Sequence, residues 1–278
     1  MTRRYRRLFF YTLCVFFLAG ASWLVLAAKG FVLNVPRRTV EGRGAIFLRI
    51  TPPDATIYLD GLSYDTPSGI RQAQAFITNL LPGVHTIAVD KEGYHRWQKK
   101  LIVLPLTVTE ENAVELFTRA PAIEPYPDKD IPFLEIDEAG RRLLSEGASS
   151  TLVLLNITRP KEGELIVAPD GTKVLIRTPH TLSVVWVEPE RFNRSRERGD
   201  REVVIESRDT ISDAVWLPDD GQHIIFAAGG KIKIAELDGR GGRNIVNFLE
   251  AADTHFFLDK SAGVIVYSDK SKLSKLHL

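Results

Sequence analysis

The sequence predicts a mainly β protein that begins with a transmembrane helix and continues into a small β-domain and a module of propeller-like β repeats. Three observations lead to this fold class: a long uncharged apolar run near the N-terminus, short β-prone runs separated by turn signals, and a motif that recurs at propeller-blade spacing. The 278 residues correspond to roughly two domains. Hydrophobic residues (44%) and charged residues (26%) occur in globular proportions, which excludes a disordered tail, a collagen-like fibre and a many-span membrane protein.

Charge and cysteine content exclude further classes. Four of the 36 basic residues lie within the first seven positions, which leaves 32 basic against 35 acidic residues, a net charge of −3, in the rest of the chain. Nucleic-acid-binding modules normally carry a basic face, so nucleic acid is not an expected partner. The sole cysteine, Cys14, lies in the apolar run. The sequence therefore predicts neither an intramolecular disulfide nor a metal site built from cysteines.

Residues 8–28, LFFYTLCVFFLAGASWLVLAA, form 21 consecutive positions without a charge. A helix of this length spans about 31 Å, which matches the hydrocarbon core of a bilayer. Arg3, Arg4, Arg6 and Arg7 precede the run without an acidic residue among them. By the positive-inside rule, residues 1–7 are expected to remain in the cytoplasm as a stub, with the bulk of the chain outside it.

Two other interpretations of this run remain open. Ala19-Gly20-Ala21 fits a signal-peptidase site after an apolar region at 8–18, which would release a secreted protein. Against cleavage, the apolar run continues beyond that site to residue 28. The other interpretation is a helix buried in a soluble domain, although such helices rarely lack polar residues over this length.

Residues 44–117 carry the pattern of a small β-domain, which follows a short basic stalk at 29–43. The predicted strands are rich in β-branched and aromatic residues and cover 45–50, 56–59, 75–79, 84–89, 97–103 and 112–116. Turn signals such as Asp60-Gly61 and Pro82-Gly83 separate them and leave no room for a helix of normal length.

The motifs in this stretch resemble those of the PEGA domain. The resemblance rests on four blocks in the family's order, whose motif residues are Pro53, Ala55, Asp60, Gly61, Thr66, Pro67, Pro82, Gly83, His85, Gly93 and Tyr94. It implies a small β-sandwich of the kind that recurs as a spacer or interaction module in prokaryotic surface and envelope proteins, without catalysis. The residues themselves favour structural roles, because they supply turns, an edge strand and an aromatic cover for a small core.

A proline-rich linker at 118–132 is expected to lead into the second module, residues 133–278. There, an apolar strand, a Pro-Asp-Gly type of turn and a second apolar strand occur around Pro169 and again around Pro218. A weaker copy without the proline surrounds Asp259. The spacings of 49 and 41 residues match the period of propeller blades.

These copies resemble the WD40-like repeats of TolB-type β-propellers. The blade-turn residues are Pro169, Asp170, Gly171, Trp216, Pro218, Asp219, Gly221, Asp238 and Gly239. A closed propeller needs about four blades or more, and the 146 residues from position 133 make little more than three. Residues 133–144 with 150–157 are the candidate for a degenerate first blade. Otherwise the module is open or completes its ring with a second copy, because exposed edge strands favour homo-association.

No catalytic motif is visible in the sequence. A nucleophile elbow, a phosphate-binding glycine loop and a His-Glu-x-x-His pair are absent, and the six histidines show no i, i+4 pairing. The sequence therefore predicts no catalytic residue, no cofactor and no metal site. The remaining conspicuous residues are expected to have structural roles. Trp97, Trp186 and Trp216 are expected in the core, and the charged stretch 188–202 is expected to form a solvated loop.

The function expected from these features is that of a noncatalytic surface or envelope protein, anchored in the cytoplasmic or plasma membrane of a prokaryote. Its β modules would bind a protein, a peptide or a cell-wall polymer, so the chain would serve as a tether or scaffold. The alternative is an extracytoplasmic sensor or ligand-binding subunit, which would signal through a partner membrane protein because the stub is too short for a signalling domain. A third class, a peptidase fronted by a propeller, would need catalytic residues that the sequence does not display.

Overall fold

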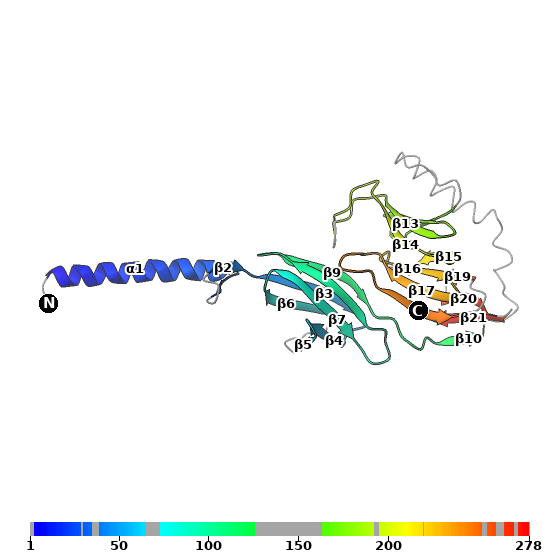
Figure 1. Ribbon diagram of the computed structural model, residues 1–278, viewed down its shortest axis with the longest axis horizontal. Coiled ribbons are helices and arrows are strands. Elements are labelled where there is room, and N and C mark those ends of the chain that lie inside the picture. Colours follow the sequence, from blue (N-terminus) through cyan, green and yellow to red (C-terminus); the bar gives the residue numbers. More distant parts are fainter. Residues whose placement is uncertain are drawn as a thin grey trace.

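The computed structural model describes residues 3–28, 30–34, 39–64, 73–125, 163–191, 195–218, 220–251, 255–259, 264–269 and 272–277. Within these residues α1 (Arg3–Ala28) is the only helix and every other element is a strand, so the mainly β class is confirmed. Figure 1 shows α1 at one end of the molecule, a first group of strands in the middle and a second group at the opposite end. We call these groups the first β-module (β3–β9) and the second β-module (β10–β21).

Helix α1 contains the predicted apolar run, and its four arginines occupy its first turns. None of its 26 residues is buried against the rest of the protein. By its length and its apolar composition, the helix could cross a membrane. Gly30 ends the helix in a left-handed conformation with φ of 84°, and its N–H donates to the carbonyl of Ala27 at 3.0 Å.

Within the predicted stalk, residues 29–43, the described residues form a hairpin. Strands β1 (Phe31–Asn34) and β2 (Thr39–Gly42) pair in an antiparallel ladder. β-Branched residues in both strands and the aromatic Phe31 favour this pairing. The hairpin ends where the N–H of Arg43 donates to the carbonyl of Gly30 at 2.8 Å.

The first β-module consists of two sheets that enclose one core. Its strands are β3 (Gly44–Thr51), β4 (Thr56–Leu59), β5 (Leu62–Tyr64), β6 (Gln74–Leu80), β7 (Gly83–Asp90), β8 (Trp97–Val103) and β9 (Val108–Glu115). One sheet has the order β6-β3-β9, with β3 and β9 parallel, and the other has the order β5-β4-β7-β8. Inward residues of both sheets, among them Leu48, Ile77, Ile87 and Leu101, form the core. All six predicted strands are present, and β5 is additional.

The second β-module contains three four-stranded antiparallel sheets, one for each predicted repeat. The first sheet is β11 (Glu164–Val167), β12 (Lys173–Arg177), β13 (Thr181–Trp186) and β14 (Arg201–Glu206). The second is β15 (Ile211–Trp216), β16 (His223–Ala228), β17 (Lys231–Glu236) and β18 (Ile245–Glu250). The third is β19 (Phe256–Asp259), β20 (Val264–Asp269) and β21 (Lys272–His277), with β10 (Ile123–Pro125) added beside β21. Apolar clusters join the first sheet to the second and the second to the third.

Two expectations for this module change. Residues 123–125, expected in an extended linker, form β10 and thereby tie the start of the module to its last strand. The stretch 188–202 is not entirely a solvated loop, since Glu190 pairs with Arg196 and its carboxylate accepts a hydrogen bond from the Trp186 indole at 2.6 Å. The additional blade proposed for 133–144 and 150–157 lies outside the described residues, and no described sheet closes on itself.

Candidate functional site: a buried polar junction

The most unusual polar region lies where strands β8 and β9 of the first β-module meet the turn between β17 and β18. Three hydrogen bonds made by β8 are among the contacts that join the two modules here. The N–H of Lys100 donates to the carbonyl of Gly241 at 3.3 Å, the N–H of Gln98 donates to Oδ1 of Asn244 at 3.2 Å, and the indole N–H of Trp97 donates to Oε2 of Glu236 at 2.9 Å. We call this region the junction.

Lys99 is the centre of the junction. Strand β8 alternates buried and exposed residues, and this alternation turns Lys99 inward together with Trp97 and Leu101. The Lys99 side chain is completely buried, with Nζ 2.8 Å from Oε1 of Glu236, 3.1 Å from Oδ2 of Asp238 and 3.2 Å from Oε2 of Glu111. One lysine thus binds carboxylates from both modules.

Arg240 supplies the second cation of this cluster. Its Nε lies 2.8 Å from Oδ2 of Asp238, and its Nη2 lies 3.1 Å from Oε2 of Glu111. The guanidinium also donates from Nη2 to the carbonyl of Glu110 at 2.9 Å. The charge of Arg243 also acts on Glu236 and Asp238, so the carboxylates of this cluster interact with more than one cation. Burial nevertheless disfavours the charged form of a carboxyl group, most strongly for the almost completely buried Glu111.

The pKa values follow from this burial and from the neighbouring charges. Burial raises the pKa of Glu111 to about 7, against the pull of Lys99, and the charges of Asp238 and Glu236 act in the same upward direction. Burial alone would lower the pKa of Lys99, but the three carboxylates outweigh it and raise that pKa above its ordinary value. Glu111 is therefore the carboxyl group of this cluster that takes up or releases a proton near neutral pH.

A second polar group of the junction surrounds His223 at the start of β16. Its Nδ1 pairs with Oδ2 of Asp220 and lies 4.0 Å from Oε2 of Glu115, the last residue of β9. The three ligand atoms lie within 4.8 Å of one another, so these residues are spaced as metal ligands can be. They are the group that could hold a metal among the described residues, although the sequence predicts none.

The repeats point to a different role for His223. The first repeat carries Lys173 at the corresponding place after its turn, and its buried Nζ lies 3.4 Å from Oδ2 of Asp170 and 3.5 Å from Oε1 of Glu190. His223 thus stands where a cation is held between two carboxylates in the neighbouring sheet. In the first sheet the second carboxylate comes from the module's own loop, whereas Glu115 of the first β-module supplies it in the second.

The charge state of His223 agrees with this role. Burial alone would lower the pKa of His223, but the hydrogen bond and charge of Asp220, together with the charges of Glu115 and Glu236, raise it above its ordinary value. Burial raises the pKa of Glu115, which the positive charge of His223 opposes. A protonated His223 accounts for both neighbours without a metal ion. We therefore interpret this group as an ion pair across the junction.

A cavity of about 10 Å³ lies beside these groups, lined among others by Trp97, Glu115, His223 and Glu236. This volume holds about one water molecule. The junction is therefore packed too tightly for a substrate, and its chemistry is that of an ion-paired joint between two modules.

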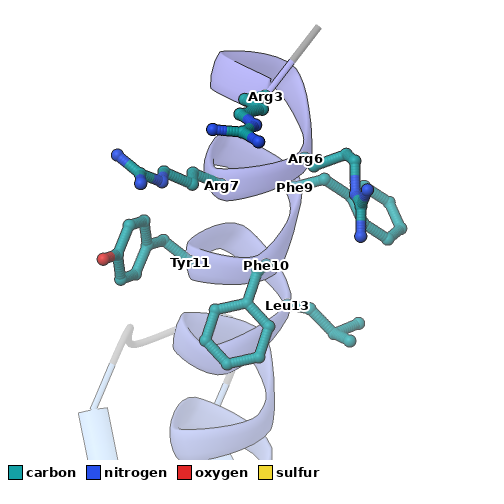
Figure 2. Close-up of a pocket in the computed structure, with 7 residues that line it drawn as sticks. All are labelled: Arg3, Arg6, Arg7, Phe9, Phe10, Tyr11 and Leu13. Carbon is teal, nitrogen blue, oxygen red and sulfur yellow. The ribbon is translucent and has the colours of Figure 1, made fainter. Parts of the chain in front are cut away.

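A larger hollow on α1 is no better as a site. Figure 2 shows its seven lining residues, which all project from the first turns of α1. These residues are Arg3, Arg6, Arg7, Phe9, Phe10, Tyr11 and Leu13. The hollow is the space between neighbouring side chains of an uncovered helix.

The PEGA-like motif residues lie mostly in separate turns. Asp60 and Gly61 form the turn between β4 and β5, with φ of 50° and 86°, and Pro82 and Gly83 form the turn between β6 and β7. The structure brings His85 to Asp60, with Nδ1 2.7 Å from Oδ2. The remaining residues support the fold from other places. Ala55 and Tyr94 pack against the core, Gly93 has φ of 81° beside Tyr94, the carbonyl of Pro53 accepts from Lys91, and Thr66 and Pro67 lie outside the described residues.

The blade-turn residues are likewise dispersed over three turns, with one exception. Pro169, Asp170 and Gly171 lie between β11 and β12, Pro218 and Gly221 between β15 and β16, and Asp238 and Gly239 between β17 and β18. Trp216 joins two sheets, because its indole N–H donates to the carbonyl of Ile166 at 3.0 Å, and Asp219 lies outside the described residues. The exception is Asp238, which is also a member of the junction.

No sequence pattern predicts a functional role for the other members of the junction, namely Lys99, Glu111, Glu115, His223, Glu236 and Arg240. One signal was present for Lys99: it occupies an inward position of a strand in which residues 97, 101 and 103 are apolar. A lysine on the buried face of an alternating strand requires a buried carboxylate partner. The pattern does not reveal that the partners come from the other module.

Stability is expected to fall as the pH rises from about 4.5 to about 7 while Glu111 ionises, and to fall further when His223 loses its proton. His223 has a raised pKa, so its contribution to folding is complete below the unfolded-state value of 6.5 and is lost as the pH passes the folded-state value. Glu111 also lowers the stability as the pH rises, between its ordinary pKa of 4.5 and its folded-state pKa of about 7, because the folded protein binds this proton more tightly than the unfolded chain does. Denaturant unfolding across this pH range measures the slope. His223→Lys should flatten its upper part, and an unchanged slope in that variant would contradict the ion-pair role of His223.

Asp60→Ala is expected to lower the free energy of unfolding by about 1–2 kcal/mol. The Asp60 carboxylate accepts from the N–H of Thr86 at 2.8 Å and pairs with His85, and its positive φ is unfavourable for alanine. Asp60→Asn keeps an acceptor and tolerates this backbone conformation, so it should lose less. Urea unfolding of the two variants makes the comparison, and equal losses would argue against the turn role.

A scan of the sequence against models of known protein families finds no match, and a search of curated proteins finds none either.

Proposed function

We propose that the protein is a noncatalytic, membrane-anchored tether of a prokaryotic cell envelope. Helix α1 crosses the membrane with its arginines in the cytoplasm, and the two β-modules form a rigid arm on the other side. The arm binds a protein, a peptide or a cell-wall polymer. The observation that carries this proposal is the buried junction, because it supports the two modules acting as one body.

Rigidity follows from the cost of opening the junction. Lys99 is fully buried between a carboxylate of its own module and two carboxylates of the other. Separating the modules without admitting water would leave these charges unpaired, and removing one member of a buried ion pair typically costs about 3–5 kcal/mol. A rigid arm holds its far module at a fixed distance from α1. Anchoring then raises the effective concentration of that module toward other envelope components, without any new contact.

The finer architecture belongs to the same proposal. We infer a PEGA-like sandwich from the two-sheet core and from the Asp60–His85 pair that joins motif residues of different blocks. We infer propeller blades from three consecutive four-stranded antiparallel sheets. Two of these carry the Pro-Asp-Gly type of turn between their first two strands.

The alternative function, a sensor that signals through a partner membrane protein, is favoured by one observation. Glu111 takes up a proton near neutral pH at the place where the modules meet. A sensor requires the modules to change their arrangement when this group titrates, whereas a tether requires the arrangement to persist.

Protease treatment of intact spheroplasts tests the anchored tether, with a different peptide tag at each end of the chain. We expect the C-terminal tag to be digested and the N-terminal tag, with α1, to remain with the membrane. Loss of the N-terminal tag from the mature protein before protease is added would show signal-peptide cleavage instead. Protection of the C-terminal tag would contradict the orientation. An envelope partner recovered in fixed stoichiometry by crosslinking would then define what the arm binds.

A further inference from the structure

The first β-module exposes a group of apolar side chains at the end from which α1 emerges. Six of them lie in or beside the β6–β7 turn and the β8–β9 loop and have exposed fractions between 44% and 64%. We call this group the apolar rim; its members are Leu81, Val84, Ile102, Leu104, Leu106 and Val108. Val84 and Ile102 lie directly opposite each other on β7 and β8. Six such residues at one end of a small module form a patch, which differs from singly scattered apolar residues.

A short chain of hydrogen bonds connects the rim to the end of α1. The N–H of Leu106 donates to the carbonyl of Arg43 at 2.9 Å, and the N–H of Arg43 donates to the carbonyl of Gly30 at 2.8 Å. The Leu106 side chain also lies against both glycines of this segment, since Cβ atoms placed on Gly30 and Gly42 would be 3.4 Å and 3.0 Å from it. The rim is thus fixed to the residue that ends the helix.

The backbone of the β8–β9 loop is strained to achieve this placement. Leu106 has φ of 59°, a left-handed conformation that glycine or asparagine adopts far more readily than leucine. Turn chemistry alone would not select a leucine here. The residue keeps an apolar side chain that is 47% exposed at the tip of the loop, beside the equally apolar Leu104.

The distances place Leu106, at the tip of the β8–β9 loop, in the headgroup layer of a bilayer. If α1 spans the hydrocarbon core up to Ala28, Gly30 lies about 3 Å beyond it. The headgroup layer on each side is about 5–8 Å thick. Leu106 contacts Gly30, so it falls within that layer. Figure 1 shows β3 and β9 running from the α1 side of the module towards the second β-module, so this end faces the membrane and the junction lies at the far end.

We propose that the apolar rim inserts into the lipid surface around α1 and seats the first β-module on the membrane. The inference rests on the proposed membrane span. The composition of the segment between α1 and the first β-module supports a lipid occupant, because residues 29–43 contain Lys29, Arg37, Arg38 and Arg43 and a single acidic residue, Glu41. A basic segment next to a membrane span in the sequence favours anionic lipid headgroups. Seating the module at two places, helix and rim, fixes the direction of the arm relative to the membrane plane.

Fluorescence quenching by lipid tests the seat, using the full chain in vesicles of phosphatidylcholine and phosphatidylglycerol. The background carries Cys14→Ser, and an environment-sensitive fluorophore is attached at Leu104→Cys. The matched control is Ile245→Cys on β18, which is 49% exposed but belongs to the second β-module. Lipids brominated near the headgroup should quench the label at 104 several-fold more strongly than the label at 245. Equal, weak quenching at both positions would overturn the proposal.

A third label separates this inference from the proposed anchor. Leu18→Cys lies in the middle of α1 and reports whether the helix is in the bilayer. Quenching at 18 by lipids brominated deep in the acyl chain, without headgroup-level quenching at 104, would sink the lipid seat and leave the anchor intact. Absence of quenching at 18 would sink the anchor, and the seat with it. A label at 104 that is shielded from water but not quenched by lipid would identify a second copy of the chain as the occupant, which also overturns the proposal.

Discussion

Lys99→Met is expected to lower the free energy of unfolding by about 3–5 kcal/mol, the largest effect of any single side-chain change at the junction. The substitution keeps much of the apolar stem but removes the ammonium group from between Glu111, Glu236 and Asp238. Arg240 still pairs with Glu111 and Asp238, but Glu236 loses the ammonium group 2.8 Å from its Oε1. Denaturant unfolding of the full chain at neutral pH measures the loss. Trp97 is the natural fluorescent reporter, because its indole bonds to Glu236 in the same cluster.

Lys100→Met is the matched control for this prediction. Lys100 is the next residue on β8 and points outward, where it is exposed. Its loss should change stability by no more than about 0.5 kcal/mol. The deficit of Lys99→Met should also shrink at acidic pH, where the stranded carboxylates become protonated. Equal, small effects of the two methionine variants would show that the buried cluster does not hold the modules together.

Gly241→Ala is expected to separate the modules by steric collision. Gly241 lies in the turn between β17 and β18 with φ of 62°, and a Cβ atom there would lie 1.7 Å from the carbonyl oxygen of Lys100. The obstacle is backbone, which cannot rotate away, so the turn must move off β8. We expect a loss of about 3 kcal/mol or more, together with faster hydrogen exchange of the β8 amides, as measured by mass spectrometry.

Gly171→Ala controls for the backbone strain in this experiment. Gly171 has a similar φ of 72° in the turn between β11 and β12, but a Cβ atom there meets nothing within 4 Å. Its substitution should cost only the strain of a left-handed alanine, about 1 kcal/mol, and leave exchange in β8 unchanged. If both alanine variants behaved alike, the close approach at Gly241 would have no part in docking the modules.

Local pattern predicted most of the individual elements. The apolar run gives α1, and the six predicted strands of the first β-module are β3, β4 and β6–β9. The recurring turn motif predicts the three sheets of the second β-module. The shortest strands could not be predicted in this way. β5 and β10 have three residues each, which is too few to show an alternation of apolar and polar residues. The β1–β2 hairpin was not predicted, because Pro36 and the glycines of this segment favoured a stalk.

The junction could not be predicted because its partners are far apart in the sequence. Lys99 and Asp238 are separated by 139 residues, and neither lies in a sequence motif that predicts a contact with the other. Asp238 was identified as a turn residue for the local reason that Asp-Gly favours turns. Its contact with Lys99 depends on how two separately folded modules pack, which local periodicity does not encode. The inward lysine of β8 was the one clue in the sequence.

The distance between the two modules tests the central claim, that they move as one body on an anchored helix, most directly. Spin labels at Thr78→Cys on β6 and Asn247→Cys on β18 occupy exposed positions in the two modules. The labelled full chain, with Cys14→Ser, would be placed in bilayers and its inter-label distances measured by pulsed electron paramagnetic resonance at about pH 6 and about pH 8, on either side of the Glu111 pKa of about 7. The account predicts one narrow distance distribution that is the same at both pH values. A broad distribution, or one that shifts with pH, would contradict the rigid tether, and a shift would favour the sensor.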